Sequence, residues 1–158
     1  MQNQPQDPKI VDAEKSGILL DERGRWFHHG QPVENAKISE FFHRSIRKDD
    51  SGNYYLHNEM GTLKEMVYFQ VEDTAYFVHH LAMDQARQKL FASLNTGEAV
   101  EIDPKSLTQD SREVMYCKVL QNDRARLTTN ALHDLSELVY EEDDGIFLEI
   151  EGRKFKLA

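Results

Sequence analysis

Short apolar segments separated by turn signals fill most of the chain after residue 17, and this pattern constrains the fold more than any other feature. Segments 18–20 and 25–28 flank Asp21-Glu22-Arg23-Gly24, which predicts two strands joined by a tight turn with Gly24 at positive φ. Similar strand patterns occupy 54–57, 63–72, 76–78, 90–94, 99–102, 114–120, 146–150 and 155–157. Residues 79–83 either extend the strand at 76–78 or begin a loop. The chain is therefore predicted to be strand-rich.

Two segments instead show the spacing of amphipathic helices. Asn35 is placed to cap the first, and Thr128 or Thr129 the second. The apolar positions that set the helical spacing are Ala36, Ile38, Phe41, Phe42, Ile46, Leu132, Leu135, Leu138 and Val139. Together, strands and helices predict the fold class α+β, as a small strand-rich single domain with two helices.

The two predicted helices lie in similar surroundings. Residues 33–46 align with 127–140 at an offset of 94, and an acidic Gly turn with a following strand comes after each helix. This similarity suggests a duplicated helix-turn-strand motif with halves at 17–84 and 85–158. The alternative, that any two units of this kind look alike, stays open. Either interpretation places one α+β domain at 17–158, after a polar segment, 1–16, that is predicted to be a disordered or loosely docked tail.

Composition excludes several classes of partner. The chain has 158 residues, and 19 Lys plus Arg against 28 Asp plus Glu give a formal net charge of -9, which argues against nucleic acid as the main partner. No segment approaches the roughly 18 consecutive apolar residues of a membrane helix, and the start lacks the pattern of a secretory signal. We therefore expect a cytoplasmic protein without a membrane partner. The lone Cys117 forbids an internal disulfide and is placed in a predicted core strand.

The pairs His28-His29 and His79-His80 raise the question of a metal site. Adjacent side chains in a strand point to opposite faces, so neither pair can chelate one ion alone. A metal-dependent hydrolase using His28, His57, His79 or Asp73 is the least favoured interpretation. The sequence also lacks a nucleophile elbow, a P-loop and a dinucleotide fingerprint. We therefore lean towards a protein that is not an enzyme, and we expect no cofactor.

Amphipathic aromatic residues are concentrated in the first half of the chain. Tyr and Trp combine an apolar body with a polar tip, so such a cluster can line a ligand cleft, although ordinary cross-strand pairs would look the same. The aromatic residues are Trp26, Phe27, Tyr54, Tyr55, Tyr68 and Tyr76, with His28 and His57 near them in sequence. From this group and nearby carboxylates we predict a ligand site formed by Trp26, His28, Tyr55, Glu65 and Asp73.

Several motifs in order resemble the bacterial family catalogued as domain of unknown function number 1285. They are Gly24-Arg25-Trp26 with Gly30-Gln31-Pro32-Val33, then Asp50-Ser51-Gly52-Asn53-Tyr54-Tyr55-Leu56, and Val71-Glu72-Asp73 with a following aromatic residue. The resemblance covers about residues 17–157, with a departure at Met66, where the family tends to have Lys. It implies a small α+β fold of repeated strand and helix motifs, a suggested role in ligand sensing or signal transduction, and no established catalytic residue.

The leading hypothesis is thus a non-catalytic ligand-binding or regulatory domain of the signal-transduction type, with a small molecule as its partner. The alternative is a protein-interaction or homodimerisation module that presents an apolar sheet face or an edge strand.

Overall fold

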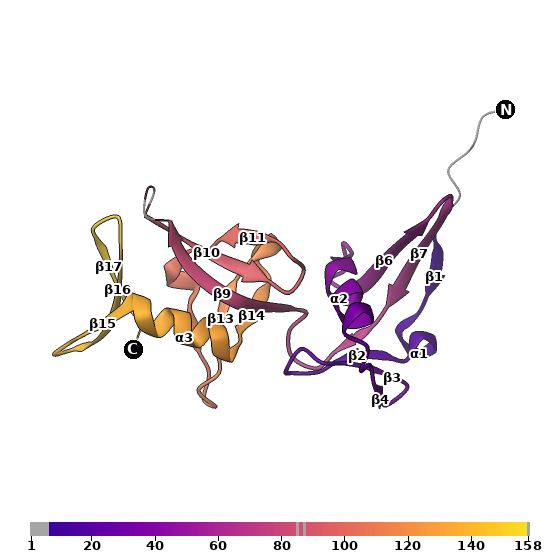
Figure 1. Cartoon of the computed structure of the whole chain (residues 1–158), viewed down its shortest axis with the longest axis horizontal. Coiled ribbons are helices and arrows are strands. Elements are labelled where there is room, and N and C mark those ends of the chain that lie inside the picture. The colour runs from indigo at the N-terminus through magenta and orange to yellow at the C-terminus, as the bar shows by residue number, and fades with distance from the viewer. Residues whose placement is uncertain (1–6, 85, 87, 158) are drawn as a thin grey trace. The chain divides into compact units, whose positions relative to one another are not determined.

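The computed structural model describes residues 7–84, 86 and 88–157, and these form an α+β, strand-rich structure, as predicted (Figure 1). The chain divides into two compact units, Met1–Ala75 and Tyr76–Ala158. The sequence suggested a division after residue 84, but strand β9 (Tyr76–Asp84) belongs to the second unit from its first residue. In the described residues no helix is both long enough and apolar enough to cross a membrane.

Unit 1 contains two four-stranded sheets, with strand orders β1-β7-β6-β5 and β4-β3-β2-β8. Most neighbouring strands are antiparallel, but β1 pairs parallel with β7, and β2 pairs parallel with β8. The elements are β1 (Lys9–Val11), α1 (Ala13–Ser16), β2 (Ile18–Leu20), β3 (Trp26–His28), β4 (Gln31–Pro32), α2 (Ala36–Ser45), β5 (Ile46–Lys48), β6 (Tyr54–Met60), β7 (Leu63–Tyr68) and β8 (Gln70–Val71).

The predicted tail, 1–16, carries two elements of unit 1. Strand β1 pairs with β7, and the short helix α1 is capped by Asp12, whose carboxylate accepts a 2.8 Å hydrogen bond from the Lys15 amide. Helix α1 ends at Gly17, which takes the left-handed conformation (φ 62°). The polar segment 1–16 did not predict either element, because β1 lies at a sheet edge, where solvated side chains are tolerated. Residues 1–6 of the predicted tail lie outside the described residues.

The segment 63–72, predicted as one strand, is two strands of different sheets. Strand β7 ends at Tyr68 and β8 begins at Gln70. Between them Phe69 is buried, and its ring centroid lies 5.0 Å from that of Trp26. Burying Phe69 thus accompanies the passage of the chain from one sheet to the other.

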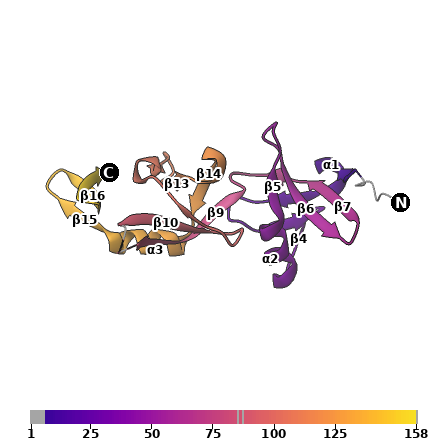
Figure 2. The same cartoon turned by 90° about the horizontal axis from the view of Figure 1, so that it is seen from above.

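Unit 2 contains a six-stranded sheet of order β11-β10-β9-β14-β13-β12 and a three-stranded antiparallel sheet of order β15-β16-β17. Helix α3 lies beside β9 (Figures 1 and 2). Besides β9, the elements are β10 (Lys89–Leu94), β11 (Ala99–Glu101), η1 (Pro104–Ser106), β12 (Thr108–Gln109), β13 (Met115–Lys118), η2 (Leu120–Asn122), β14 (Arg124–Leu127), α3 (Thr129–Leu138), β15 (Val139–Glu142), β16 (Gly145–Ile150) and β17 (Arg153–Lys156).

Both predicted helices form with the predicted caps. The Asn35 side chain accepts hydrogen bonds from the Lys37 and Ile38 amides at the start of α2, and Thr128 accepts one from the Ala131 amide at the start of α3. Thr128 Oγ1 also donates a 2.9 Å hydrogen bond to the Val78 carbonyl, which ties the start of α3 to β9.

The helix-turn-strand motif occurs in both units. In each, a ten-residue helix leads directly into a three-stranded antiparallel arrangement, β5-β6-β7 after α2 and β15-β16-β17 after α3. The two N-caps, Asn35 and Thr128, are 93 positions apart, so the alignment at an offset of 94 is one residue out of register.

Candidate functional site

Trp26, the centre of the predicted site, lies in the core of unit 1. Only 2% of the residue is exposed, and its ring packs against Phe42, His43 and Phe69 with centroid distances of 5.3, 5.3 and 5.0 Å. Trp26 therefore does not line an open cleft. The sequence could not distinguish the two environments because a strand carries a Trp equally well on a buried or an open face.

The other predicted site residues lie apart from one another. His28 is exposed beside His29, at a ring distance of 4.4 Å. Tyr55 of β6 is half-buried against Tyr68 of β7, and Glu65 lies on the opposite face of that sheet, because Glu65 and Tyr68 are an odd number of residues apart on one strand. Asp73 is half-buried after β8.

Two tyrosines of the predicted aromatic cluster do line a groove in unit 1. The Tyr68 hydroxyl donates a 2.9 Å hydrogen bond to Asp49. Burial, together with this bond, raises the pKa of Tyr68, while hydrogen bonds led by that from the Asn53 amide lower the pKa of Asp49. The groove has a volume of about 870 Å³, and among its lining residues are Ile10, Leu19, Tyr54, Tyr68, Phe69 and Val71.

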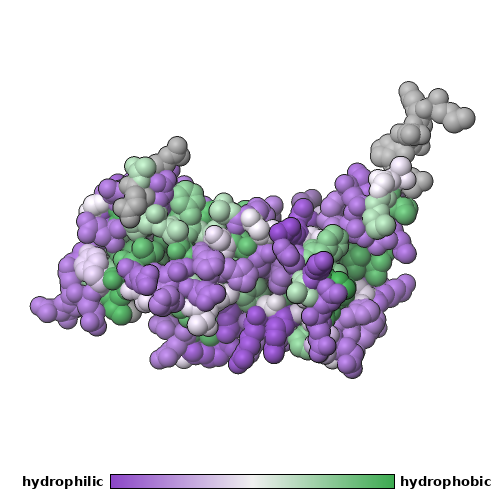
Figure 3. Space-filling view, viewed as in Figure 1, coloured by the Kyte–Doolittle hydropathy of each residue, from purple (hydrophilic) through white to green (hydrophobic). Residues whose placement is uncertain are grey.

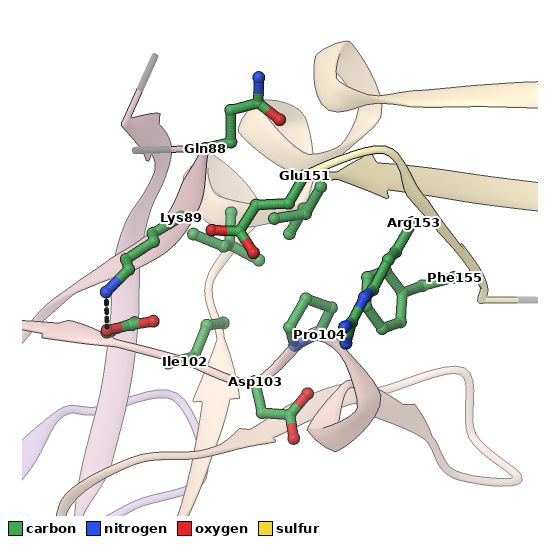
Figure 4. Close-up of a pocket in the computed structure, with 11 residues that line it drawn as sticks. Gln88, Lys89, Ile102, Asp103, Pro104, Glu151, Arg153 and Phe155 are labelled. Atoms are coloured by element: carbon green, nitrogen blue, oxygen red, sulfur yellow. Dashed lines mark ion pairs between the residues drawn. The ribbon is translucent and has the colours of Figure 1, made fainter. Parts of the chain in front are cut away.

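A more compact pocket lies in unit 2, where the sequence predicted strands but no ligand site (Figure 4). It has a volume of about 470 Å³ and is built by strands β10 and β11, the start of η1 and the hairpin β16-β17. Its apolar lining residues are Leu90, Ile102, Pro104, Ile150 and Phe155, and its polar ones are Gln88, Lys89, Glu101, Asp103, Glu151 and Arg153.

Three of the charged groups around the unit 2 pocket already have structural partners. Lys89 Nζ lies 3.6 Å from the carboxylate of Glu101, across the pairing of β10 with β11. Asp103 caps η1, where its carboxylate accepts a 2.9 Å hydrogen bond from the Lys105 amide. The chain enters η1 at Pro104, whose fixed φ suits the first helical position.

The remaining two charged groups, Glu151 and Arg153, come from the hairpin turn between β16 and β17. Ile150 and Arg153 are cross-strand partners, so Glu151 and Gly152 are the two turn residues, with φ of 54° and 74°. This is the backbone of a type I′ turn. Within the described part of the chain, neither the Glu151 carboxylate nor the Arg153 guanidinium makes an ion pair or a hydrogen bond.

The sequence pattern predicts both parts of this pocket but not the pocket itself. The first part contains the predicted strands 90–94 and 99–102, and the second contains the predicted strands 146–150 and 155–157. The parts are about 50 residues apart, and local patterns do not encode which hairpin faces which. One local signal was available: an acidic residue at a turn position that favours Asn, Asp or Gly.

Histidines and the thiol form no metal or nucleophile site in the described residues. No group of three or more His, Cys, Asp and Glu side chains there could hold a metal ion. His79 and His80 lie together on β9, and partial burial lowers the pKa of His79. Cys117 is buried in β13, as predicted for a core strand, and burial raises the pKa of its thiol to about 12.

On the face seen in Figure 3, small groups of apolar residues lie among many hydrophilic ones. In unit 1 the most exposed large apolar side chains are Met60, Ile10, Leu63, Phe41 and Ile38. Met60 and Leu63 are cross-strand partners at the tip of the β6-β7 hairpin, and Ile38 and Phe41 are neighbours on α2.

Comparison with known proteins identifies the fold. No family model and no curated protein matches the chain. Two crystal structures match it. The first is a DUF1285 family protein from Silicibacter pomeroyi DSS-3, with a TM-score of 0.64 and 19% identity over 99% of this chain and 89% of that chain. The second is a DUF1285 family protein from Shewanella baltica OS155, with a TM-score of 0.56 and 19% identity over 79% of this chain and 94% of that chain.

The chain has the DUF1285 fold. The family expected from the sequence motifs is thus the one whose solved structures this chain resembles, and the implied small α+β fold is confirmed.

Proposed function

We propose that this protein is a non-catalytic ligand-binding domain and that its small-molecule site is the pocket of unit 2. The observation that carries the proposal is the composition of that pocket. A volume of about 470 Å³ lies against the buried side chains Leu90, Ile102 and Ile150, and polar side chains surround it. Concave sites with an apolar lining and a few placed polar groups are the usual form of a small-molecule site.

The groups around the pocket suit binding better than bond cleavage. Lys89 is paired with Glu101, and Asp103 is held as a cap, so these charges serve the local structure. The lining residues include no Ser, Cys or His in the described chain. A regulatory role of the signal-transduction type is part of the same proposal, since a binding domain acts by coupling its occupancy to another process. We also propose a cytoplasmic location.

Thermal-shift measurements with a broad library of metabolites test this proposal. A compound at about 100 times its dissociation constant should add about 2.7 kcal/mol to the free energy of unfolding. The variant Pro104→Trp places a large ring at the pocket and should abolish the shift. The matched control Lys105→Trp changes the next residue of η1, which does not line the pocket, and should keep it. A library without any shift on the unaltered protein would contradict the proposal.

A second candidate function, as a homodimerisation module, is favoured by the surface of unit 1. Strand β8 is the last strand of its sheet and lines the apolar groove, and Phe41 is 52% exposed on α2. Unpaired edges and exposed apolar faces are common protein-binding surfaces. Light scattering coupled to size exclusion should then give a dimer that Phe41→Glu separates and Lys37→Glu leaves intact. A monomer at all concentrations would remove this candidate.

A further inference from the structure

We propose that the ligand of the unit 2 pocket is a small zwitterion with an apolar body, in its simplest form an α-amino acid with an apolar side chain. Glu151 would bind the ammonium group and Arg153 the carboxylate. This inference rests on the proposed function of the pocket, because it specifies the chemistry of the ligand that the pocket binds.

The first observation is the pairing state of the charges around the pocket. Lys89 and Glu101 neutralise each other, and Asp103 is engaged by the Lys105 amide. Only Glu151 and Arg153 keep unengaged charged groups among the described lining residues. The pocket therefore offers one anion and one cation, which is the complement of a ligand that carries both signs.

The second observation is where these two groups lie. Figure 4 shows the Glu151 carboxylate on the Lys89 side of the opening and the Arg153 guanidinium on the Pro104 side, with the pocket between them. The two groups are near in sequence and opposite in charge, yet they form no ion pair with each other. A ligand placed between them can contact both without first breaking an ion pair.

The third observation is the conformation of Glu151. Its φ of 54° is in the left-handed region, which a side chain with a Cβ disfavours and which Asn or Gly would adopt at lower cost. Strained residues of this kind occur at ligand sites, where the side chain has a use that offsets the strain. In this hairpin, the strained turn directs a carboxylate to the pocket.

The apolar lining residues of the pocket select the rest of the ligand. Leu90, Ile102 and Ile150 are each at most 9% exposed, and Phe155 of β17, which also lines the pocket, is half-buried. An aliphatic or aromatic side chain of the ligand would cover these groups, whereas a charged side chain would leave its charge against an apolar surface. We therefore expect leucine-like or phenylalanine-like ligands and not glutamate-like or lysine-like ones.

Calorimetric titration with a matched set of compounds tests the inference on the full chain. The set is leucine, 4-methylpentanoic acid, which lacks the ammonium group, and 3-methylbutylamine, which lacks the carboxylate. Removal of either charged group should weaken binding roughly tenfold or more, as expected for the loss of a charge-assisted hydrogen bond.

Two variants assign the contacts. Glu151→Asn removes the carboxylate, so the variant should bind leucine no better than the unaltered protein binds 4-methylpentanoic acid. Because Asn suits the type I′ turn, the unfolding temperature of this variant should stay equal or rise. Arg153→Gln should reduce leucine binding to the level seen with 3-methylbutylamine. The matched control Arg112→Gln changes a cation outside the pocket and should leave binding unchanged.

The outcomes separate this inference from the proposed function. If 4-methylpentanoic acid binds as tightly as leucine, or if Glu151→Asn binds leucine normally, the zwitterion assignment is overturned and the pocket remains a binding site. The assignment also falls if none of the twenty amino acids shifts the unfolding temperature although other compounds do. If no compound of the broad library binds, the proposed function itself fails.

Discussion

At the scale of single residues, Trp26 is the side chain on which the core of unit 1 most depends. It is fully enclosed by aromatic rings from α2 and from the junction of β7 with β8. Trp26→Ala should lower the free energy of unfolding by about 3 to 5 kcal/mol, because the large cavity can collapse only in part. Urea unfolding followed by far-ultraviolet circular dichroism measures the change, since Trp26 is the sole tryptophan and its fluorescence is lost.

A matched variant isolates packing from hydrogen bonding at the same position. The Trp26 Nε1 group is buried and has no hydrogen-bond partner in the described residues. Trp26→Phe therefore removes no hydrogen bond, and it should be less destabilising than Trp26→Ala. If Trp26→Ala lowered the free energy of unfolding by less than about 1 kcal/mol, the assignment of Trp26 to the core would fail.

At the scale of elements, three turns share one construction. In each, the carboxylate of a leading aspartate accepts hydrogen bonds from the backbone amides two and four residues later. The aspartates are Asp21, Asp49 and Asp110. The residue three positions on has positive φ in all three turns, and it is Gly24, Gly52 or Glu113. Two of these turns were predicted from their glycines, and the third lacks the glycine that would have marked it.

The odd residue of the three turns gives a prediction with its own control. Glu113 has φ of 66° where the other turns have glycine, so Glu113→Gly should raise the free energy of unfolding by about 1 kcal/mol. Gly52→Ala should lower it by about the same amount, because an added Cβ meets only Lys48 Cε at 3.9 Å and the effect is conformational. The urea midpoints of the two variants measure these changes. If both variants changed the free energy of unfolding in the same direction, the three turns would not share one construction.

Helix α3 is tied to β9 by a titratable contact. The Asp134 carboxylate accepts hydrogen bonds from the Leu81 amide and from the ring of His80, both at 3.1 Å. The Leu81 bond most of all, and then the His80 bond and the charges of His80 and His133, lower the pKa of Asp134. Its contribution to stability is therefore complete above the unfolded carboxyl pKa of about 3.9 and is lost as the pH falls through the folded value.

Replacement of this carboxylate should weaken the acid dependence of stability. Asp134→Asn can still accept the Leu81 bond but does not titrate, so its urea midpoint should fall less than that of the unaltered protein between pH 6 and pH 3. Asp49 and Asp110, whose pKa values are also lowered, should contribute to the dependence that remains. Identical acid dependence in both proteins would show that the titration of Asp134 contributes nothing to stability.

At the scale of the whole molecule, the two compact units each contain a core of their own. Unit 1 buries Ile18, Leu20, Trp26, Ile46, Leu56, Phe69 and Ala75. Unit 2 buries a larger set, namely Tyr76, Phe77, Val78, Leu81, Leu90, Ala92, Leu94, Ile102, Leu107, Tyr116, Cys117, Ala125, Leu127, Ala131, Leu135, Phe147, Leu148 and Ile150. Each set lies within one continuous segment of the chain, which is the property expected of a unit that folds alone.

Separate expression of the segments 1–75 and 76–158 tests this independence. Both fragments should unfold cooperatively in urea and give dispersed amide spectra by nuclear magnetic resonance. The fragment 76–158 contains every lining residue of the unit 2 pocket and should keep its ligand binding. Collapsed spectra from both fragments would show that neither core is sufficient.

The sequence alone determined the local features of this protein. Helices α2 and α3 with their caps, the turns at Gly24 and Gly52, and the core position of Cys117 follow from residues within a few positions of each other. These features are set by backbone sterics, short-range hydrogen bonds and hydrophobic periodicity, which act along the chain. The edge strand β1 escaped prediction because its stability comes from a distant partner, β7.

Only the tertiary structure decided which side chains meet. It enclosed Trp26, separated Tyr55 from Glu65 on two faces of one sheet, and brought the Glu151-Gly152 turn to Ile102 and Asp103. Such contacts depend on strand order and on the packing of segments about 50 residues apart, and several arrangements satisfy the same alternation of apolar and polar residues. The pocket of unit 2 is a product of that packing.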